Sequence, residues 1–264
     1  MSESTLYQFT GSELTPVTWC QVGEETVVTA DSWRVVDGQA LGLHHHLERF
    51  RRSVESAAPE AVASVQKFIH VALEHIPPTG EWFPRIECLA TPDGHLFRFY
   101  HREAPERVTT AILATAPHDP RTQPLVKGPD LDALMGLRKA VAPAGATEAV
   151  IVTPEGFIAE GAYSSLVVWP PSGEEIWVVD SSIPRIPSVT EKLVADIAHS
   201  QGIAVVGKHM RPEALTDHAV WVVSALHGVR EATSWAAGPA LACDSERTRT
   251  WNRLLHEHYT PVTA

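Results

Sequence analysis

The chain has 264 residues, of which 44% are apolar, so it is long enough for one large domain or two packed lobes. Its 21 basic and 32 acidic residues give a formal net charge of −11, which argues against nucleic acid and acidic membrane surfaces as partners. The three cysteines match no metal-binding spacing, and neither an export leader nor an apolar run of membrane-spanning length can be read in the sequence, so we expect a soluble cytoplasmic protein.

The first part of the chain, residues 1–116, is predicted to form an α/β lobe. Alternating apolar and polar residues predict short strands, and two amphipathic patterns predict helices. Asp37-Gly38 and Pro92-Asp93-Gly94 are turn signals that join neighbouring strands into hairpins. The expected strands span residues 26–29, 33–36, 85–90, 95–100 and 109–114, and the expected helices span residues 47–57 and 61–75.

Residues 117–124 carry three prolines in eight residues and no periodicity, so we predict a linker there between two lobes. The second lobe is expected to span residues 125–264. Its predicted helices cover residues 131–142, 190–200 and 245–258, and its predicted strands cover residues 148–152, 157–160, 164–169, 175–179, 203–206, 219–223 and 229–234.

Lys127 is the first candidate for a reactive residue. It follows the apolar pair Leu125-Val126 and precedes Gly128. Partial desolvation at such a place lowers the pKa of a lysine and makes its amine available for Schiff-base chemistry. Taken by itself, this short sequence favours an ordinary surface lysine at the end of a linker, because lysines with perturbed pKa values are rare.

Glu160 and the helix start near residue 190 are candidates for holding a cofactor. Glu160 ends an apolar strand and precedes two small residues, which let a flat ring approach the backbone. A carboxylate in that place can keep a pyridine nitrogen protonated. The turn formed by residues 187–190 opens a helix whose free amide groups can bind a phosphate. The alternatives are a solvated glutamate and a plain helix cap.

His44-His45-His46 suggests a metal site at first sight, but we predict none. We place these residues on a strand, where consecutive side chains point to opposite faces, and no partner cysteine or acidic cluster is visible. Arg49 follows at the start of an amphipathic helix, where it can bind a phosphate through two hydrogen bonds or simply remain in solvent.

Five segments together resemble the class IV, fold-type IV enzymes that depend on pyridoxal 5'-phosphate (PLP). This group includes branched-chain aminotransferases, D-amino-acid aminotransferases and aminodeoxychorismate lyases. The similarity runs in the right order over roughly residues 30–235. The matching segments are HHLERFRRS at 45–53, VKGPDLDALMGLRKAVAPAGATEAVIV at 126–152, GFIAEGAYSSLVVW at 156–169, PSVTEKLVADIAHSQGI at 187–203 and VWVVSALHGVREAT at 220–233.

The resemblance implies an α+β fold with a small N-terminal α/β lobe and a larger C-terminal lobe, which holds a barrel-like sheet with helices. It also implies a homodimer that binds PLP. Lys127 is then the Schiff-base lysine and the base that moves the substrate proton, and Glu160 faces the pyridine nitrogen. By the same resemblance, Arg49, Val189 and Thr190 hold the phosphate. Ser224 and Ala225 complete the pocket from a second loop.

Several positions depart from the family pattern. The stretch Thr29-Ala30-Asp31-Ser32-Trp33-Arg34-Val35 stands where members carry a Tyr-Gly-Asp-Gly-Phe-Glu-Thr-like sequence that shapes the substrate side. Ser165, Ser188 and Ser224 replace residues that are usually asparagine, glycine, and asparagine or threonine. The substrate is therefore left open, and so is its carboxylate site, for which Arg98 and Arg230 are candidates.

The resemblance favours an aminotransferase that moves an amino group between an amino acid and a 2-oxo acid by a ping-pong route. A lyase of the aminodeoxychorismate type, which releases pyruvate, uses the same lysine and the same cofactor. A third reading is a protein that binds PLP but has lost catalysis. Retention of Lys127 argues against this third reading, since binding alone requires no reactive amine.

Overall fold

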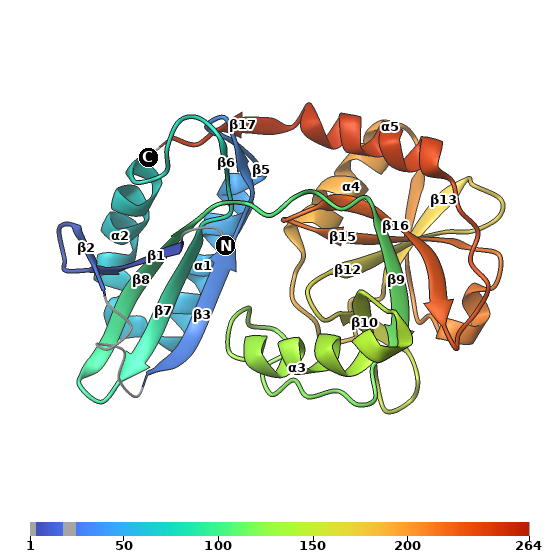
Figure 1. Ribbon diagram of the computed structural model, residues 1–264, viewed down its shortest axis with the longest axis horizontal. Helices are drawn as coiled ribbons and strands as arrows, with labels where there is room; N and C mark the ends of the chain where they lie inside the picture. Colours follow the sequence, from blue (N-terminus) through green and yellow to red (C-terminus); the bar gives the residue numbers. More distant parts are fainter. Residues whose placement is uncertain (1–3, 18–24, 264) are drawn as a thin grey trace. The chain divides into compact units, whose positions relative to one another are not determined.

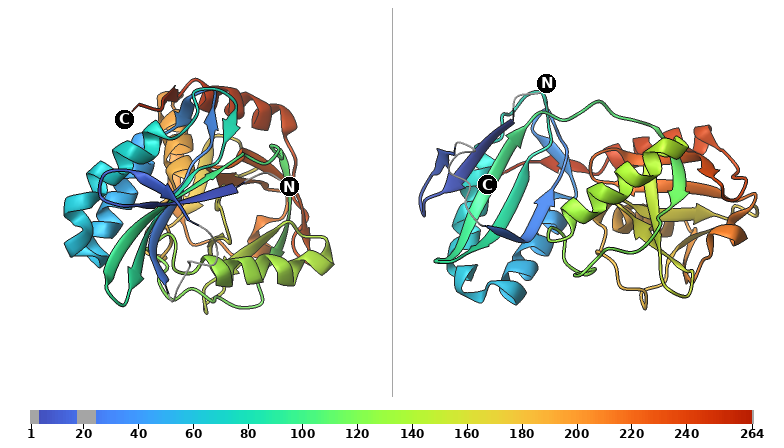
Figure 2. Two further views of the ribbon diagram at one scale, coloured as in Figure 1. Left: turned by 60° about the vertical axis from the view of Figure 1, so that its left-hand side comes forward. Right: turned by 60° about the horizontal axis from the view of Figure 1, so that its bottom comes forward.

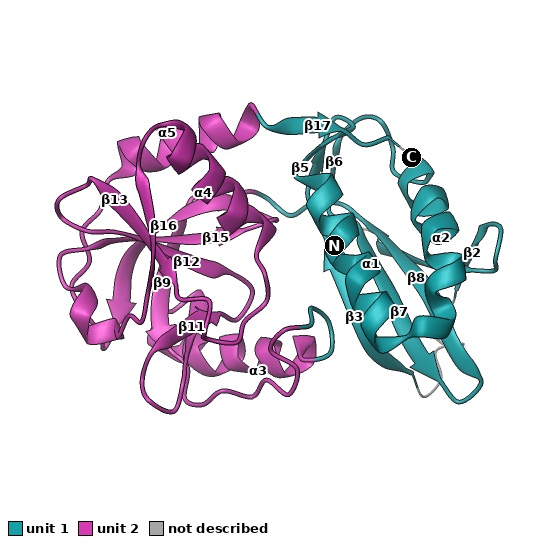
Figure 3. Ribbon diagram, turned by 180° about the vertical axis from the view of Figure 1, so that it is seen from behind, with its two compact units in different colours: residues 1–106, 126–129, 258–264 teal, residues 107–125, 130–257 magenta. Residues whose placement is uncertain are grey.

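The computed structural model describes residues 4–17 and 25–263, so Cys20 lies outside the described residues. Figures 1 and 2 follow the chain from its N-terminus to its C-terminus, and Figure 3 colours its two compact units. Unit 1 contains Met1–Glu106, Val126–Pro129 and His258–Ala264, and unit 2 contains Arg107–Leu125 and Asp130–Glu257.

This division differs from the one expected from the sequence. Residues 117–124 lie within unit 2, and Lys127 belongs to unit 1. The reason is hydrogen bonding: the N–H of Ala30 donates to the carbonyl oxygen of Lys127, so a short return segment joins the first unit. The end of the chain returns to the same unit through a strand at Tyr259–Pro261.

Unit 1 is built on an antiparallel sheet of five strands in the order β2-β1-β8-β7-β3. The predicted turn at residues 92–94 joins β7 to β8, and the one at Asp37-Gly38 joins two strands of a smaller sheet, ordered β17-β5-β4-β6. The strands are β1 (Ser4–Phe9), β2 (Leu14–Pro16), β3 (Thr26–Ser32), β4 (Val35–Val36), β5 (Gln39–Leu41), β6 (Glu81–Trp82), β7 (Arg85–Thr91), β8 (Gly94–Arg102) and β17 (Tyr259–Pro261).

Two helices, α1 (Leu43–Ala57) and α2 (Val62–Glu74), cover one face of the five-stranded sheet, with the short 3-10 helix η2 (Pro59–Ala61) between them (Figure 3). Alternation along the strands explains this packing, because Phe97 and Phe99 of β8 point to the helices. The ring of Phe97 stacks on that of Phe68 with centroids 4.8 Å apart. Burial of each such ring stabilises the unit by roughly 1.5–3 kcal/mol.

The three consecutive histidines lie on α1 and not on a strand, so that part of the prediction is wrong. Gly42 precedes the helix with φ of 61°, in the left-handed region that glycine adopts without a steric penalty. This turn lets the helix begin at Leu43, four residues before the predicted start. Within residues 4–17 and 25–263, no group of three or more His, Cys, Asp or Glu residues is arranged to hold a metal ion.

Unit 2 is built on a mixed sheet of eight strands in the order β11-β10-β9-β16-β15-β12-β13-β14. Strand β9 is parallel to both of its neighbours, β13 is parallel to β14, and the other pairs are antiparallel. The strands are β9 (Thr110–Thr115), β10 (Glu148–Val152), β11 (Ile158–Gly161), β12 (Ser165–Trp169), β13 (Glu175–Val179), β14 (Ala204–Lys208), β15 (Ala219–Ser224) and β16 (Gly228–Ala236).

The helices of unit 2 lie where apolar residues recur with helical spacing. They are α3 (Leu131–Val141), α4 (Val189–Ser200) and α5 (Ser245–His256), with 3-10 helices η3 (Ala142–Ala144) and η4 (Pro212–Leu215). In the part of the chain that the structure describes, no helix combines the length and the apolar character needed to span a bilayer.

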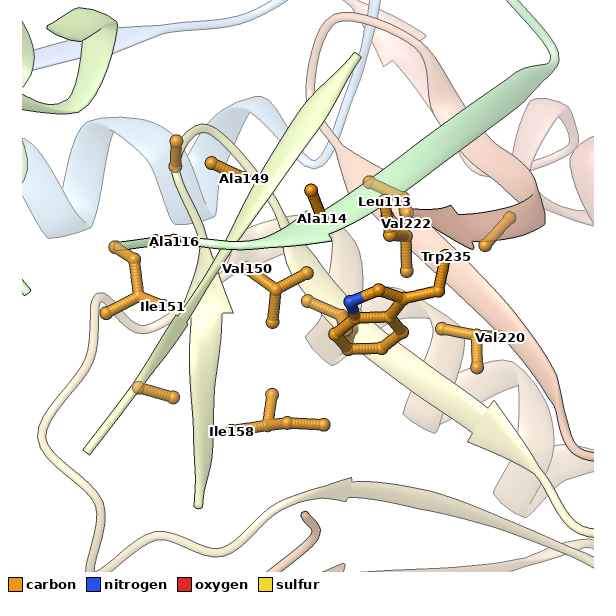
Figure 4. Close-up of a cluster of buried hydrophobic side chains, with 14 of the residues drawn as sticks. Leu113, Ala114, Ala116, Ala149, Val150, Ile151, Ile158, Val220, Val222 and Trp235 are labelled. Atoms are coloured by element: carbon orange, nitrogen blue, oxygen red, sulfur yellow. The ribbon is translucent and has the colours of Figure 1, made fainter. Parts of the chain in front are cut away.

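The core of unit 2 is formed by side chains of several strands (Figure 4). Leu113, Val150, Ile158 and Val222 are completely buried, which fits strands with near-continuous apolar sequences. Trp235 lies among them and donates its indole N–H to Thr115 Oγ1 at 3.1 Å, so its polar atom is satisfied inside the core. This packing holds the ends of β11 and β15, which carry candidate site residues.

Candidate functional site

Lys127 is fixed to strand β3 of unit 1 through its own backbone. The N–H of Ala30 and the hydroxyl of Thr29 both donate to the carbonyl oxygen of Lys127, at 2.7 and 3.1 Å. The next residue, Gly128, has φ of +131°, and a Cβ there would lie 2.6 Å from the nitrogen of Ala30. Only glycine fits this close approach. The contact of this segment with β3 therefore explains why a glycine follows Lys127.

The buried side chains of Asp31 and His46 form a charge cluster with half-buried Arg49 in the same unit. Arg49 Nε and Nη2 donate to the two carboxylate oxygens of Asp31, each at 2.8 Å. His46 Nδ1 lies 2.8 Å from Asp31 Oδ1. Burial alone would raise the pKa of Asp31, but the charge of Arg49 and the hydrogen bond with His46 hold it well below its usual range. Asp31 therefore stays ionised and orients Arg49.

The protonation of His46 follows from this arrangement. Burial lowers the pKa of His46, and the positive charges of Arg49 and Lys127 lower it further, against the opposing effect of Asp31. Because an ionised carboxylate can only accept, neutral His46 carries its proton on Nδ1 and donates to Asp31. Asp31 and His46 were not predicted as site residues from the sequence. A signal was present, because His46 and Arg49 are three residues apart and so share a helix face.

Glu160 lies at the end of β11 in unit 2, where 5% of its surface is exposed. Burial raises the pKa of Glu160 to about 7, although Arg121 opposes the rise. Arg121 Nη1 donates to Glu160 Oε1 at 2.6 Å, and the same side chain also binds Asp119 and the carbonyl of Pro184. Arg121 was missed because its segment has the composition of a linker.

Helix α4 of unit 2 begins with a set of donors suited to an anion. Ser188 is the N-cap, and its Oγ accepts the N–H of Glu191 at 3.2 Å. Val189 and Thr190 follow, both buried, and their N–H groups donate to no acceptor in the described part of the chain. Free amides together with the helix dipole favour a bound negative group. Ser188 thus replaces the usual glycine of the family without loss of the helix start.

Ser224 and Ala225 lie where β15 ends and the chain turns into β16. Both are half-buried, and Ser224 Oγ accepts the N–H of His227 at 3.4 Å, at the long end of hydrogen-bond distances. The seven predicted residues are therefore divided between the units. Unit 1 holds Lys127 and Arg49, and unit 2 holds Glu160, Val189, Thr190, Ser224 and Ala225.

The two arginines considered for a substrate carboxylate are both paired within the chain. Arg98 is buried and forms a two-pronged ion pair with Glu25. Arg230 is also buried, and its Nη2 donates to Glu148 Oε2 at 2.9 Å. Glu148 also accepts the N–H of Tyr163 through its other oxygen. These contacts give each arginine a structural task within its own unit.

Known proteins resemble the chain in sequence pattern and in structure. The family model for class IV amino-transferases matches residues 29–235, whereas no curated protein sequence matches the chain significantly. Among solved structures, the branched-chain aminotransferase of Thermoproteus uzoniensis with norvaline superposes with a TM-score of 0.80 at 14% identity, over 99% of this chain and 100% of that chain.

Two further solved structures superpose on most of the chain. For the fold IV transaminase CpuTA1 of Curtobacterium pusillum the TM-score is 0.73 at 16% identity, over 96% of this chain and 97% of that chain. For a hypothetical aminotransferase of Mycobacterium tuberculosis in its PLP-bound form the TM-score is 0.74 at 14% identity, over 97% and 98%. These likenesses confirm the predicted α+β fold of fold type IV. Since the family model covers most of the sequence, the chain belongs to the class IV family of pyridoxal-phosphate-dependent aminotransferases.

Proposed function

We propose that this protein is an aminotransferase that moves an amino group between an amino acid and a 2-oxo acid by a ping-pong route, with Lys127 as the reacting amine. The docking of Lys127 and Gly128 on β3 is the observation that carries the proposal. Two hydrogen bonds fix the backbone of Lys127, and the glycine that follows cannot be replaced by a residue with a side chain. A preorganised nucleophile requires such a fixed backbone.

The residues present fit PLP. The free amides of Val189 and Thr190 and the guanidinium of Arg49 are donors for a phosphate, and Glu160 is an acceptor for a pyridine N–H. When bound, PLP supplies an electron sink for the electrons of the substrate α-carbon. Ser224 and Ala225 complete the pocket from the turn between β15 and β16.

The protein's own groups then have distinct tasks. Lys127 Nζ takes the proton from the α-carbon of the amino donor. In the second half of the ping-pong route it supplies a proton to the α-carbon that comes from the 2-oxo acid. Arg121 favours the ionised form of Glu160 and so opposes the burial that raises its pKa to about 7. Asp31 and His46 hold Arg49 in a single orientation. A homodimer, which the family resemblance implies, and a cytoplasmic location, which the sequence composition predicts, are also part of the proposal. Light scattering of the purified protein measures the oligomeric state.

Borohydride reduction of the protein with PLP, followed by peptide mapping, tests the role of Lys127. We expect the reduced adduct on the peptide that contains Lys127, and we expect Lys127→Arg to lose it. Lys139→Arg is the matched control, because Lys139 is an exposed lysine of α3 and should leave the adduct unchanged. An adduct that persists in Lys127→Arg, or that maps to another lysine, would contradict the proposal.

A screen of amino donors and 2-oxo acid acceptors tests the transfer itself. We expect a new amino acid to form only when both a donor and an acceptor are present, in equal amounts with the 2-oxo acid product. Release of pyruvate from an aminodeoxychorismate-type substrate without any acceptor would show that the protein is a lyase and not an aminotransferase. A protein that binds PLP on Lys127 but converts no donor would be a binding protein and not an enzyme.

A further inference from the structure

Unit 2 contains a cavity of about 660 Å³ that no candidate site residue lines. Its size lies within the range of small-molecule sites, roughly 300–1,000 Å³. Two threonines and an asparagine contribute to the wall, and the remaining side chains are ionisable. These ionisable residues are Arg107, His227, Glu246, Arg249, Arg253 and His256.

The charge of this cavity is opposite to that of the whole chain. Three arginines and two histidines face a single carboxylate, on a protein with a formal net charge of −11. Arg249 Nε donates to the carbonyl oxygen of Ser245 at 3.2 Å, and Arg253 Nη2 donates to Thr250 Oγ1 at 3.3 Å. Neither guanidinium forms an ion pair with a carboxylate among the residues that the structure describes. By contrast, carboxylates neutralise Arg34, Arg49, Arg98, Arg121, Arg185 and Arg230.

Helix α5 does not by itself explain these arginines. Arg249 and Arg253 are four residues apart on one helix face, where like charges destabilise a helix by roughly 0.2–0.5 kcal/mol. The helix dipole favours Arg253 and His256 in the last turn, but Arg249 lies in the middle of the helix and Arg107 comes from outside it. The accumulation of positive charge therefore needs another reason.

The wall that carries the arginines is firmly held. Asn252 Oδ1 accepts the N–H of Val229 at 3.0 Å, and Asn252 Nδ2 donates to the carbonyl of the same residue at 2.8 Å. On the opposite side of α5, Trp251 packs edge-on against Trp221 with ring centroids 5.3 Å apart. A helix anchored in this way presents its arginines in a defined place, which preorganises them for a ligand.

We propose that this cavity binds a small organic anion carrying at least two phosphate or carboxylate groups. Guanidinium groups bind such groups through paired hydrogen bonds, and two arginines one helix turn apart suit a ligand with more than one anionic centre. The site is additional to the one proposed for PLP, and it does not depend on the reaction that the protein catalyses.

Titration calorimetry at constant ionic strength tests this site, with pyrophosphate and citrate as probes and saturating PLP present. We expect at least one probe to bind the unaltered protein. The double variant Arg249→Gln/Arg253→Gln should weaken that binding by at least roughly tenfold, because it removes two charge-assisted contacts. Arg52→Gln is the control, since Arg52 is an exposed arginine of α1 in unit 1, and it should bind as the unaltered protein does.

The outcomes separate the possible sources of binding. Binding of pyrophosphate alone identifies a phosphate site, whereas binding of both probes identifies a general polyanion site. Binding that occurs only without PLP belongs to the cofactor's phosphate donors and overturns the proposal, as does the absence of any binding or equal binding by the double variant. If the double variant fails to fold, Arg249→Lys keeps the charge without the forked geometry and should still weaken binding measurably.

Discussion

Asp31 in unit 1 and Glu160 in unit 2 are both buried carboxylates that contact an arginine, yet their acidities are shifted in opposite directions. Burial acts on each of them and, alone, raises the pKa of both. The pKa of Asp31 is nevertheless held well below its usual range, whereas that of Glu160 is raised to about 7. Burial beside an arginine is therefore not enough to predict the charge of a carboxyl group.

The number of hydrogen-bond donors around each group explains the difference. Asp31 accepts both forks of Arg49, the Nδ1–H of His46 and the N–H of Ser32. Among the described residues, Glu160 accepts only two donors, the backbone N–H of Ile186 and one nitrogen of Arg121. Arg121 also donates to Asp119 and to the carbonyl oxygen of Pro184. An arginine shared with a second carboxylate compensates the cost of burying the first one only in part.

Asp31→Ala removes the carboxylate that has more donors, and it should cause the largest reduction in the free energy of unfolding. It removes the carboxylate that His46 and Arg49 both contact, and breaking a buried ion pair from one side costs about 3–5 kcal/mol. We expect urea unfolding to show a loss of that size. The control is Glu48→Ala, which removes the exposed ion pair with Arg52 and should cost less than about 1 kcal/mol. A similar loss in both variants would mean that burial does not distinguish the two pairs.

Glu160→Gln tests the carboxyl group with fewer donors through the pH dependence of the protein's stability. A raised carboxyl pKa means that the folded protein keeps a proton that the unfolded chain has already lost, so the contribution of Glu160 to stability falls as the pH rises from about 4.5 to about 7. Glutamine cannot ionise and shows no such fall. The difference in unfolding free energy, variant minus unaltered protein, should therefore increase by on the order of 1–3 kcal/mol between pH 5 and pH 8. Urea unfolding of the cofactor-free protein measures it, and a constant difference would show that Glu160 titrates normally.

The contrast between local and long-range information explains what the sequence could predict. Strands β10 and β13 were predicted with their observed limits, because a run of apolar residues between turn signals is a local pattern. Strands β1 and β2 were not predicted. Strand β1 pairs with residues of β8 that lie 90 to 98 positions away, and no local sequence pattern indicates this partner. The start of α1 was misplaced because Gly42 adopts a left-handed conformation that lets the helix begin early.

The candidate site follows the same rule. Lys127 and Glu160 were found from motif spacing, and their roles remain proposals. Arg121 was not found, because its contact with Glu160 joins residues 39 positions apart and its own segment has the composition of a linker. Asp31 was quoted only as part of a departure from the family pattern. Its pairing with Arg49 needs the return of α1 onto β3, which the sequence does not show.

His46 provides the smallest and most selective test of the comparison, because two substitutions remove the imidazole and differ in one donor. Asparagine places an amide N–H where Nδ1 stood, whereas leucine offers no donor to Asp31. The stabilising effect of ionised Asp31 is present above the unfolded pKa of the carboxyl and is lost as the pH falls through the folded value.

Loss of the donor raises that folded pKa and removes about 1 kcal/mol of the effect, so His46→Leu should unfold at a higher pH than His46→Asn during acid titration. Comparison of the two variants cancels the loss of the buried neutral imidazole, whose protonation below its ordinary pKa would otherwise oppose folding in acid. Tryptophan fluorescence measures both midpoints. Equal midpoints would mean that a donor at position 46 does not contribute to the low pKa of Asp31, and that the number of donors does not explain its difference from Glu160.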